Sequence, residues 1–185
     1  MTKQNFMTQI TLQDKIFNQY ISAQEIEAAV KNIAERINND LKNEYLPVFL
    51  SILNGAFMFT SDLMKNIQFD CMLSFVKLSS YDGLSSKGTI NELIGLNFDL
   101  TGKTVILLED IVDTGVTLEH LVHTISKYNP KQLKIAAMLF KPEAYSKDIK
   151  LDYTGIHVSN EFIVGYGLDY NGLGRNYPEI YKLIK

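Results

Sequence analysis

Residues Val105-Ile-Leu-Leu-Glu-Asp-Ile-Val-Asp-Thr-Gly-Val-Thr117 form the stretch that decides the fold. An apolar run of strand length leads into Glu109 and Asp110, then into Asp113 and a Thr-Gly-x-Thr turn that opens a helix. In open α/β sheets, ligands bind at the carboxyl ends of the strands, which is where these acids would lie. The stretch therefore predicts a strand–turn–helix unit of an α/β fold, with a ligand site at the turn.

The residue types in this turn suit a phosphorylated sugar. The backbone N–H groups of the turn from Thr114 to Thr117 can point at a phosphate, assisted by the helix N-terminus and the threonine hydroxyls. Gly115 permits the tight backbone. The carboxylates suit sugar hydroxyls or a hydrated Mg²⁺, because hard cations prefer oxygen ligands.

The alternative is a strand with a polar exit and a helix that uses Asp113 as its N-cap. Three acids alone would favour that alternative, but their combination with the phosphate-type turn favours a site. The chain has no G-x-x-x-x-G-K-[ST] motif, so the turn is not a Walker loop.

Strands alternate with helices on both sides of this stretch. Ser22-Ala-Gln-Glu25 predicts a capping box, and apolar residues at three- and four-residue steps from Ile26 to Leu41 predict the helix that follows. Short apolar runs predict strands buried on both faces, which indicates a mainly parallel twisted sheet flanked by helices. The other expected elements are strands at 47–53, 69–78, 104–108 and 133–140 and helices at 56–66 and about 117–128.

Two segments lack a helical or strand period. Residues 79–91 are polar and rich in glycine and serine, which predicts a mobile loop. Residues 157–185 are rich in Tyr, Gly and Asn and predict an irregular flap. The length of 185 residues, without repeats or a linker, predicts one domain.

The composition narrows the class of protein. A formal net charge of −3 and a pI near 5.6 argue against a nucleic-acid or membrane-surface protein. Cys71 is the sole cysteine, which excludes an intrachain disulfide and a cysteine-based zinc site. No apolar run is long enough to span a bilayer and no signal core follows the N-terminus, so we expect a cytoplasmic protein. His120 and His123 lack a third ligand nearby, and we interpret them as ordinary surface or core side chains.

The segment Leu108–Thr117 resembles the phosphoribosyl pyrophosphate-binding motif of type I phosphoribosyltransferases. More narrowly, the chain resembles the hypoxanthine (hypoxanthine-guanine) phosphoribosyltransferases over about residues 45–180, in five segments that occur in the expected order. The resemblance implies the type I phosphoribosyltransferase fold, with a core of about residues 22–156 and a small hood of about 1–21 with 157–185.

The resemblance also implies a reaction. The family are pentosyltransferases (glycosyltransferases) of purine salvage that use Mg²⁺ to join hypoxanthine or guanine to phosphoribosyl pyrophosphate, releasing IMP or GMP and pyrophosphate. It further implies a homodimer or homotetramer, with no nucleic acid or membrane as partner.

By position, the resemblance assigns the groups that contact phosphoribosyl pyrophosphate and metal. The ribose hydroxyls and Mg²⁺ would be held by Glu109 and Asp110, with Asp169 as a further metal ligand. Arg175 would pair with pyrophosphate, where its fork gives bidentate contacts. The remaining contacts are those of the 5′-phosphate, with Asp113, Thr114, Gly115, Val116 and Thr117, and those of the pyrophosphate loop, with Leu53, Asn54 and Gly55.

Two positions depart from the family pattern. Many relatives carry Lys where this chain has Asn54, so the loop would bind pyrophosphate through its backbone N–H groups. Relatives often have an aromatic residue where this chain has Gly174. The resemblance leaves open whether the Leu53–Asn54 peptide is cis.

The resemblance also assigns the groups that recognise the base. Asp113 would accept or donate a proton at the purine imidazole ring, and Lys141 would donate to the 6-oxo group. Phe162 would stack on the purine, and the Ile163 backbone would read its edge.

Ser80 and Tyr81 match the closing loop of the family. The transition state resembles an oxocarbenium ion that water would capture, so transfer requires a lid that excludes solvent.

Two other functions stay open at this point. One is a related phosphoribosyltransferase for xanthine, adenine or a pyrimidine, although Lys141 and Phe162 favour a 6-oxopurine. The other is a nucleotide-sensing RNA-binding regulator on the same fold, which the acidic balance of the chain disfavours. The relative preference for hypoxanthine, guanine and xanthine is not resolved by the sequence.

Overall fold

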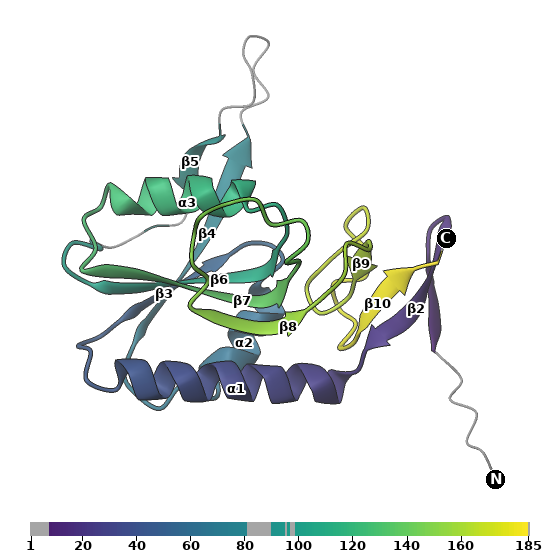
Figure 1. Cartoon of the computed structure of the whole chain (residues 1–185), viewed down its shortest axis with the longest axis horizontal. Coiled ribbons are helices and arrows are strands. Elements are labelled where there is room, and N and C mark those ends of the chain that lie inside the picture. Colours follow the sequence, from purple (N-terminus) through teal and green to yellow (C-terminus); the bar gives the residue numbers. More distant parts are fainter. Residues whose placement is uncertain (1–7, 81–89, 95, 97–98, 185) are drawn as a thin grey trace.

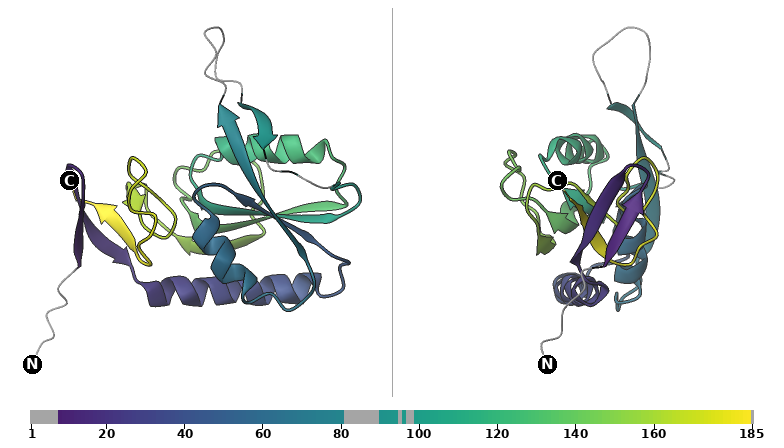
Figure 2. Two further views of the ribbon diagram at one scale, coloured as in Figure 1. Left: turned by 180° about the vertical axis from the view of Figure 1, so that it is seen from behind. Right: turned by 90° about the vertical axis from the view of Figure 1, so that its right-hand side faces the viewer.

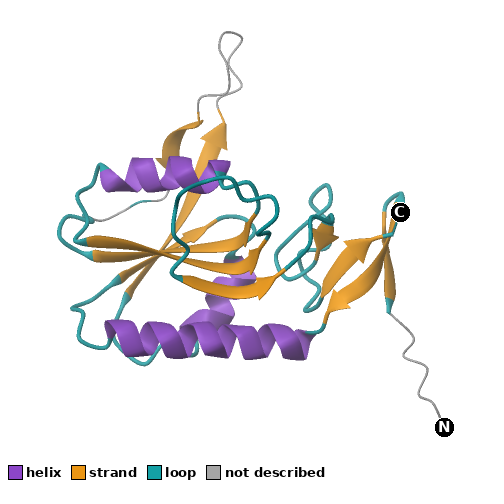
Figure 3. Ribbon diagram, in the orientation of Figure 1, coloured by secondary structure: helices purple, strands orange, loops and turns teal. Residues whose placement is uncertain are grey.

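The structure, a computed structural model, describes residues 8–80, 90–94, 96 and 99–184, with 78–80 and 90–94 described through their backbone alone. Figure 3 shows how its helices and strands are arranged. In chain order the elements are β1 (Gln9–Leu12), β2 (Lys15–Ile21), α1 (Ala23–Leu41), β3 (Val48–Ile52), α2 (Phe57–Met64), β4 (Met72–Ser80), β5 (Ile90–Ile94), β6 (Thr104–Val112), α3 (Val116–Ser126), β7 (Gln132–Phe140), β8 (Tyr153–His157), β9 (Ile163–Val164) and β10 (Ile180–Leu183).

A six-stranded sheet in the order β5-β4-β3-β6-β7-β8 forms the centre of the molecule. The pairs β4–β3, β3–β6, β6–β7 and β7–β8 are parallel, and only the edge strand β5 is antiparallel to its neighbour. The predicted fold, a mainly parallel sheet flanked by helices, is therefore confirmed.

Helices cover both faces of this sheet, with α1 and α2 on one side and α3 on the other (Figure 1). Strand residues alternate between the two faces. Phe49 and Ile106 pack in the core under α1 and α2, whereas Leu50 and Leu107 pack in the core under α3. Burying each such side chain stabilises the fold by about 1.5–3 kcal/mol.

The predicted capping box at the start of α1 is confirmed. The Ser22 hydroxyl accepts from the Glu25 N–H at 3.3 Å, and the Glu25 carboxylate accepts from the Ser22 N–H at 2.9 Å. The predicted apolar stripe is the buried face of the helix, from Ile26 to Leu41.

A second, antiparallel sheet in the order β1-β2-β10-β9 brings the two ends of the described chain together. We call residues 8–21 and 157–184 the hood; it lies beyond one end of the central sheet, next to the start of α1 (Figure 1). The prediction of an irregular flap for 157–185 was wrong in part, because β9 and β10 pair with the N-terminal hairpin. These strands are only two and four residues long, too short to give a periodic pattern.

Other boundaries also differ from the expectation. The strand predicted at 104–108 continues to Val112, because Glu109, Ile111 and Val112 still pair with β7. Strands β5 and β8 were not predicted; both lie at the edges of the sheet, and neither has a continuous apolar sequence. The loop predicted at 79–91 is shorter at both ends, since β4 includes Ser80 and β5 begins at Ile90; its remaining residues, 81–89, lie outside the described residues.

The topology places a crevice beside the ends of β3 and β6. From β3 the chain crosses through α2 to β4, and from β6 it crosses through α3 to β7, in opposite directions along the sheet. The two crossover helices consequently lie on opposite faces (Figure 2). Loops at such a switch point separate and leave room for a ligand. The loop 53–55 after β3 and the segment 109–115 of β6 and its following turn meet there.

No helix in the part of the chain that the structure describes is long and apolar enough to cross a lipid bilayer.

Candidate active site

Glu109 and Asp110 lie side by side near the carboxyl end of β6. Burial, and next the neighbouring Asp110, raise the pKa of Glu109 well above its ordinary value. Burial raises the pKa of Asp110 to about 6, opposed by the N–H of Ile111, which donates to its carboxylate at 2.8 Å, and by Arg175. Burial is thus the main cause of both raised pKa values, and carboxyl groups perturbed in this way cluster at functional sites.

These two carboxylates fit a divalent cation. Glu109 Oε2 is buried and accepts no hydrogen bond from the described chain. An unpaired buried carboxylate oxygen is costly unless a ligand completes its partners. Carboxylate oxygens are the donors that Mg²⁺ prefers, and a bound cation would favour the charged form of both groups.

The turn after β6, where the sequence predicts phosphate contacts, lines a hollow. Gly115 has φ +84° and precedes α3, and a Cβ at this position would lie 2.5 Å from the ring of Tyr145. Only glycine fits both the backbone and the space. The first N–H groups of α3 have no acceptor within the helix. With the strand end they line a hollow of about 270 Å³ bounded by Glu109 to Leu118. Its wall includes Asp113, Thr114, Gly115, Val116 and Thr117.

The loop Leu53–Gly55 lies directly against the acidic pair. A Cβ on Gly55 would lie 1.6 Å from Asp110 Oδ2, so no side chain fits at this position. The Leu53–Asn54 peptide is cis. Asn54 is exposed. The structure therefore brings together the predicted pyrophosphate loop and the predicted metal ligands, which are more than fifty positions apart in the sequence.

The hood contributes Asp169 and Arg175 to the same place. Their side chains form an ion pair, with Arg175 Nη2 and Asp169 Oδ1 2.5 Å apart, and the other Asp169 oxygen accepts from the Gly172 N–H at 2.7 Å. The departure at Gly174 has a structural reason: it has φ +97°, and a Cβ there would lie 2.8 Å from Leu12 of β1. The N-terminal hairpin thus occupies space beside the segment that carries the arginine.

A second hollow of about 220 Å³ lies between the end of β6 and the hood. It shares Asp110, Ile111 and Asp113 with the first hollow, so the two adjoin. The rest of its wall combines a cation, an aromatic ring and charged groups of the hood: Lys141, Phe162, Ile163, Leu168, Asp169 and Arg175.

Lys141 and Asp113 both line this second hollow and are in direct contact. Lys141 Nζ donates to Asp113 Oδ2 at 2.9 Å, and Lys141 is only 8% exposed. An interior lysine with one carboxylate partner retains further N–H donors for a ligand.

Phe162 forms the aromatic wall of the second hollow and is 47% exposed. Its ring centroid lies 6.3 Å from that of the buried Phe17 and 6.0 Å from that of Tyr170 in an edge-on contact. A half-exposed ring held from behind by two others presents a flat apolar face to a ligand.

The structure adds residues that the sequence did not indicate. Ile111 and Leu168 line the second hollow, and the ring of Tyr145 packs against Gly115. Ile111 and Leu168 lie within segments that had been recognised, but nothing in their residue type distinguishes a pocket wall from a core position. Of the predicted lid residues, Ser80 is described only as the last residue of β4, and Tyr81 lies outside the described residues.

Within the described residues, no three His, Cys, Asp or Glu side chains are grouped closely enough to hold a metal by themselves. His120 lies 3.4 Å from the Thr124 hydroxyl on α3, and His123 is exposed on the same helix. A cation beside Glu109 and Asp110 would therefore need ligand oxygens or water to complete its coordination.

Comparison with known proteins gives a consistent answer. The family described as phosphoribosyl transferase domain matches residues 17–171. The chain is 36% identical over 164 residues to the hypoxanthine-guanine phosphoribosyltransferase of Aquifex aeolicus, covering 88% of this chain and 92% of that protein. It is 35% identical over 161 residues to the corresponding protein of Bacillus subtilis, covering 86% and 89% of the two chains.

A solved structure agrees in fold. The crystal structure of a hypoxanthine-guanine phosphoribosyltransferase from Bacillus anthracis superimposes with a TM-score of 0.82 and 34% identity, covering 92% of this chain and 99% of that one. These likenesses extend over nearly the whole chain, including both the central sheet and the hood. The chain belongs to the type I phosphoribosyltransferase family and, within it, to the hypoxanthine(-guanine) phosphoribosyltransferases.

Proposed function

We propose that the chain transfers the phosphoribosyl group of phosphoribosyl pyrophosphate to hypoxanthine or guanine, forming IMP or GMP and pyrophosphate in purine salvage. The observation that carries this proposal is the pair of adjoining hollows that share Asp110, Ile111 and Asp113. One hollow has groups suited to binding a phosphate, and the other has groups suited to binding a flat base. A ribose that joins the two would lie beside Glu109 and Asp110.

The phosphate groups would occupy two places. The 5′-phosphate would accept from the first N–H groups of α3 and from the hydroxyls of Thr114 and Thr117. Pyrophosphate would lie between the backbone of the Leu53–Gly55 loop and Arg175, which would exchange its ion pair with Asp169 for phosphate oxygens. Glu109 and Asp110 would hold the ribose hydroxyls.

Mg²⁺ fits the site beside Glu109 and Asp110, and Asp169 would hold a further ion on the hood side. When bound, the cation would neutralise charge on the leaving pyrophosphate. The residues of the chain would hold the attacking base nitrogen, the ribose anomeric carbon and the leaving pyrophosphate oxygen in line and keep water away.

Base selection follows from the donors around the second hollow. Lys141 carries only N–H donors and so favours an oxygen at the purine 6 position over the amino group of adenine. As the base nitrogen bonds to the ribose anomeric carbon and pyrophosphate leaves, Asp113 would accept the proton that the imidazole ring loses. Phe162 would stack on the purine, and the Ile163 backbone would read its edge.

The proposal extends to groups that the geometry does not test. Ser80 and Tyr81 would close over the reacting atoms as a lid. We also propose one domain, made of a core at about 22–156 and a hood at about 1–21 with 157–185, assembled as a homodimer or homotetramer in the cytoplasm, as family membership implies.

The test is a panel of bases. We expect Mg²⁺-dependent formation of IMP from hypoxanthine and of GMP from guanine, with adenine and uracil at background because neither presents a 6-oxopurine edge to Lys141. Product nucleotides would be separated and quantified by chromatography, with xanthine included to settle the order among 6-oxopurines. Turnover that is faster with adenine or uracil than with hypoxanthine would contradict the proposed base site.

Lys141→Met is expected to weaken base recognition selectively. Methionine retains the buried apolar stem but has no donor for the 6-oxo group. Losing a hydrogen bond to a charged donor corresponds to about a ten- to hundredfold increase in KM for hypoxanthine. The KM for phosphoribosyl pyrophosphate should change by less than about threefold, since Lys141 lies outside the wall of the phosphate hollow. Equal losses for both substrates in steady-state kinetics would contradict this role.

A further inference from the structure

A partly buried hydrogen bond joins the hood to the core beside the pyrophosphate loop. Tyr166 follows β9 in the hood, is only 4% exposed, and donates its hydroxyl to Asp62 Oδ2 at 2.9 Å. Asp62 lies on α2, the helix that begins directly after the Leu53–Gly55 loop. The bond thus links residues 104 positions apart.

The residue after Tyr166 touches the pyrophosphate loop itself. Gly167 has φ +99°, and a Cβ there would lie 2.0 Å from the carbonyl oxygen of Gly55. Gly55 is in turn packed against Asp110, as described above. Hood and loop therefore meet backbone to backbone, and the loop in turn packs against the Asp110 side chain, which leaves little room to absorb a displacement.

Gly167 also determines where Arg175 lies. The Gly167 N–H donates to the Arg175 carbonyl at 3.0 Å, and the Gly167 carbonyl accepts from Arg175 Nη1 at 2.6 Å. A shift of Gly167 away from Gly55 would consequently carry the arginine away from the Leu53–Gly55 loop.

We infer that Tyr166 and Asp62 are a positioning pair that fixes the distance between Arg175 and the Leu53–Gly55 loop. This distance in turn sets the affinity for pyrophosphate and for phosphoribosyl pyrophosphate. The inference rests on the proposed function, which assigns pyrophosphate to these two groups. Neither residue touches the substrate. Their bond acts by holding the two halves of the site at the binding distance, so that binding free energy is not consumed in bringing them together.

The bond is separable from the fold of the hood. The Tyr166 backbone N–H donates to the Tyr177 carbonyl at 2.8 Å, and the Tyr166 ring belongs to the core cluster between the helices and the sheet. Phenylalanine at this position retains both contacts and loses only the bond to Asp62.

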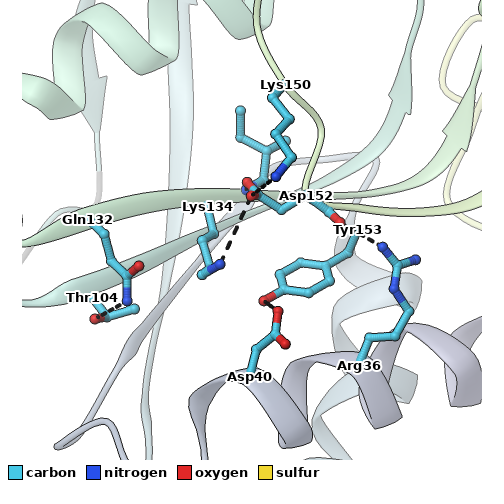
Figure 4. Close-up of polar contacts among 9 residues, drawn as sticks. Arg36, Asp40, Thr104, Gln132, Lys134, Lys150, Asp152 and Tyr153 are labelled. Atoms are coloured by element: carbon cyan, nitrogen blue, oxygen red, sulfur yellow. Dashed lines mark hydrogen bonds and ion pairs between the residues drawn. The ribbon is translucent and has the colours of Figure 1, made fainter.

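A second tyrosine supplies a matched control. Tyr153 at the start of β8 is 1% exposed. Its hydroxyl donates at 2.9 Å to Oδ2 of Asp40, a residue of α1 (Figure 4). Asp40 lies near the end of α1 that is remote from the hood, as Figure 1 shows. Tyr153→Phe thus removes a partly buried Tyr–Asp bond of equal length far from the site.

The test compares these two variants in binding and turnover. Loss of one such bond in Tyr166→Phe is expected to raise both the KM for phosphoribosyl pyrophosphate and the calorimetric Kd for pyrophosphate with Mg²⁺ about five- to tenfold. The KM for hypoxanthine should change less than about twofold, because base contacts lie elsewhere. Tyr153→Phe should lower the thermal midpoint about as much as Tyr166→Phe does, but it should leave every binding constant unchanged.

Variants of the partner complete the test. Asp62→Asn keeps an oxygen that can accept from the tyrosine hydroxyl and should bind pyrophosphate like the native chain. Asp62→Ala should reproduce Tyr166→Phe, and the double variant should add no further loss, since both changes break the same bond. Asp62→Ala also serves if Tyr166→Phe fails to fold.

Unchanged pyrophosphate affinity in Tyr166→Phe and Asp62→Ala, or an equal change in Tyr153→Phe, would overturn the inference. Failure of the proposed function has a different outcome, namely no turnover by the native chain with any base. The pyrophosphate titration does not depend on turnover, so it decides the role of the pair in either case.

Discussion

The double variant Glu109→Gln, Asp110→Asn is expected to lose turnover by about a thousandfold or more, because it removes the charges that we propose hold Mg²⁺ and the ribose. Both side chains keep their size. Their pKa values are raised in the folded chain, and a carboxyl with a raised pKa destabilises the fold above its unfolded pKa. The free energy of unfolding at neutral pH should therefore not fall with activity. Steady-state rates and urea denaturation would measure the two effects.

The control for this variant is Glu35→Gln, Asp70→Asn, which makes the same change of charge at two exposed positions. Its rate should match that of the native chain. A further readout is ligand-linked stability: Mg²⁺ with phosphoribosyl pyrophosphate should raise the thermal midpoint of the native chain and of the control, but not that of Glu109→Gln, Asp110→Asn. A folded site variant with near-native turnover would exclude these two residues from the reaction.

Asp113→Asn is expected to lower kcat by about a hundred- to ten-thousandfold, the range typical for removal of a general base. The amide oxygen can still accept from Lys141, so the geometry of the pair should persist, but the group can no longer take a proton. The Asp113 side chain is 47% exposed, so its loss of charge should change stability little. The KM for phosphoribosyl pyrophosphate should stay within about threefold, because the backbone of the phosphate cradle is unchanged.

The chain offers a matched control for this variant. Glu119 on α3 pairs with Lys147 at 2.7 Å, with a carboxylate about as exposed as that of Asp113. Glu119→Gln removes a similar ion pair without touching the second hollow and should leave kcat unchanged. If Asp113→Asn retained more than about a tenth of native kcat, Asp113 would not be the proton acceptor.

The sequence predicted those helices and strands whose own residues show a local pattern, such as a cap or an apolar face. Helix α1 shows a capping box and an apolar face, and β6 is an apolar run that ends in acids. The paired strands of the hood are different. Strands β9 and β10 are held by partners at the opposite end of the chain, so their stability comes from long-range pairing rather than from a pattern of their own.

The candidate site also has a part that the sequence predicted and a part that it did not. The phosphate cradle is one continuous segment, and its residue types alone indicate a turn and a helix start. The close approach of Gly55 to Asp110, and that of Gly167 to Gly55, are contacts between distant segments. Only the packed structure reveals them, since a glycine in a sequence does not say what lies where its side chain would be. The bond from Tyr166 to Asp62 is hidden from the sequence for the same reason.

The most direct test of phosphoribosyl transfer is the stoichiometry of the two products. The folded chain, incubated with Mg²⁺, phosphoribosyl pyrophosphate and hypoxanthine, should release pyrophosphate and form IMP in equal amounts, and release should fall to background when hypoxanthine is omitted. Equal release with and without the base would indicate hydrolysis rather than transfer, and no release with hypoxanthine would contradict the proposed activity altogether.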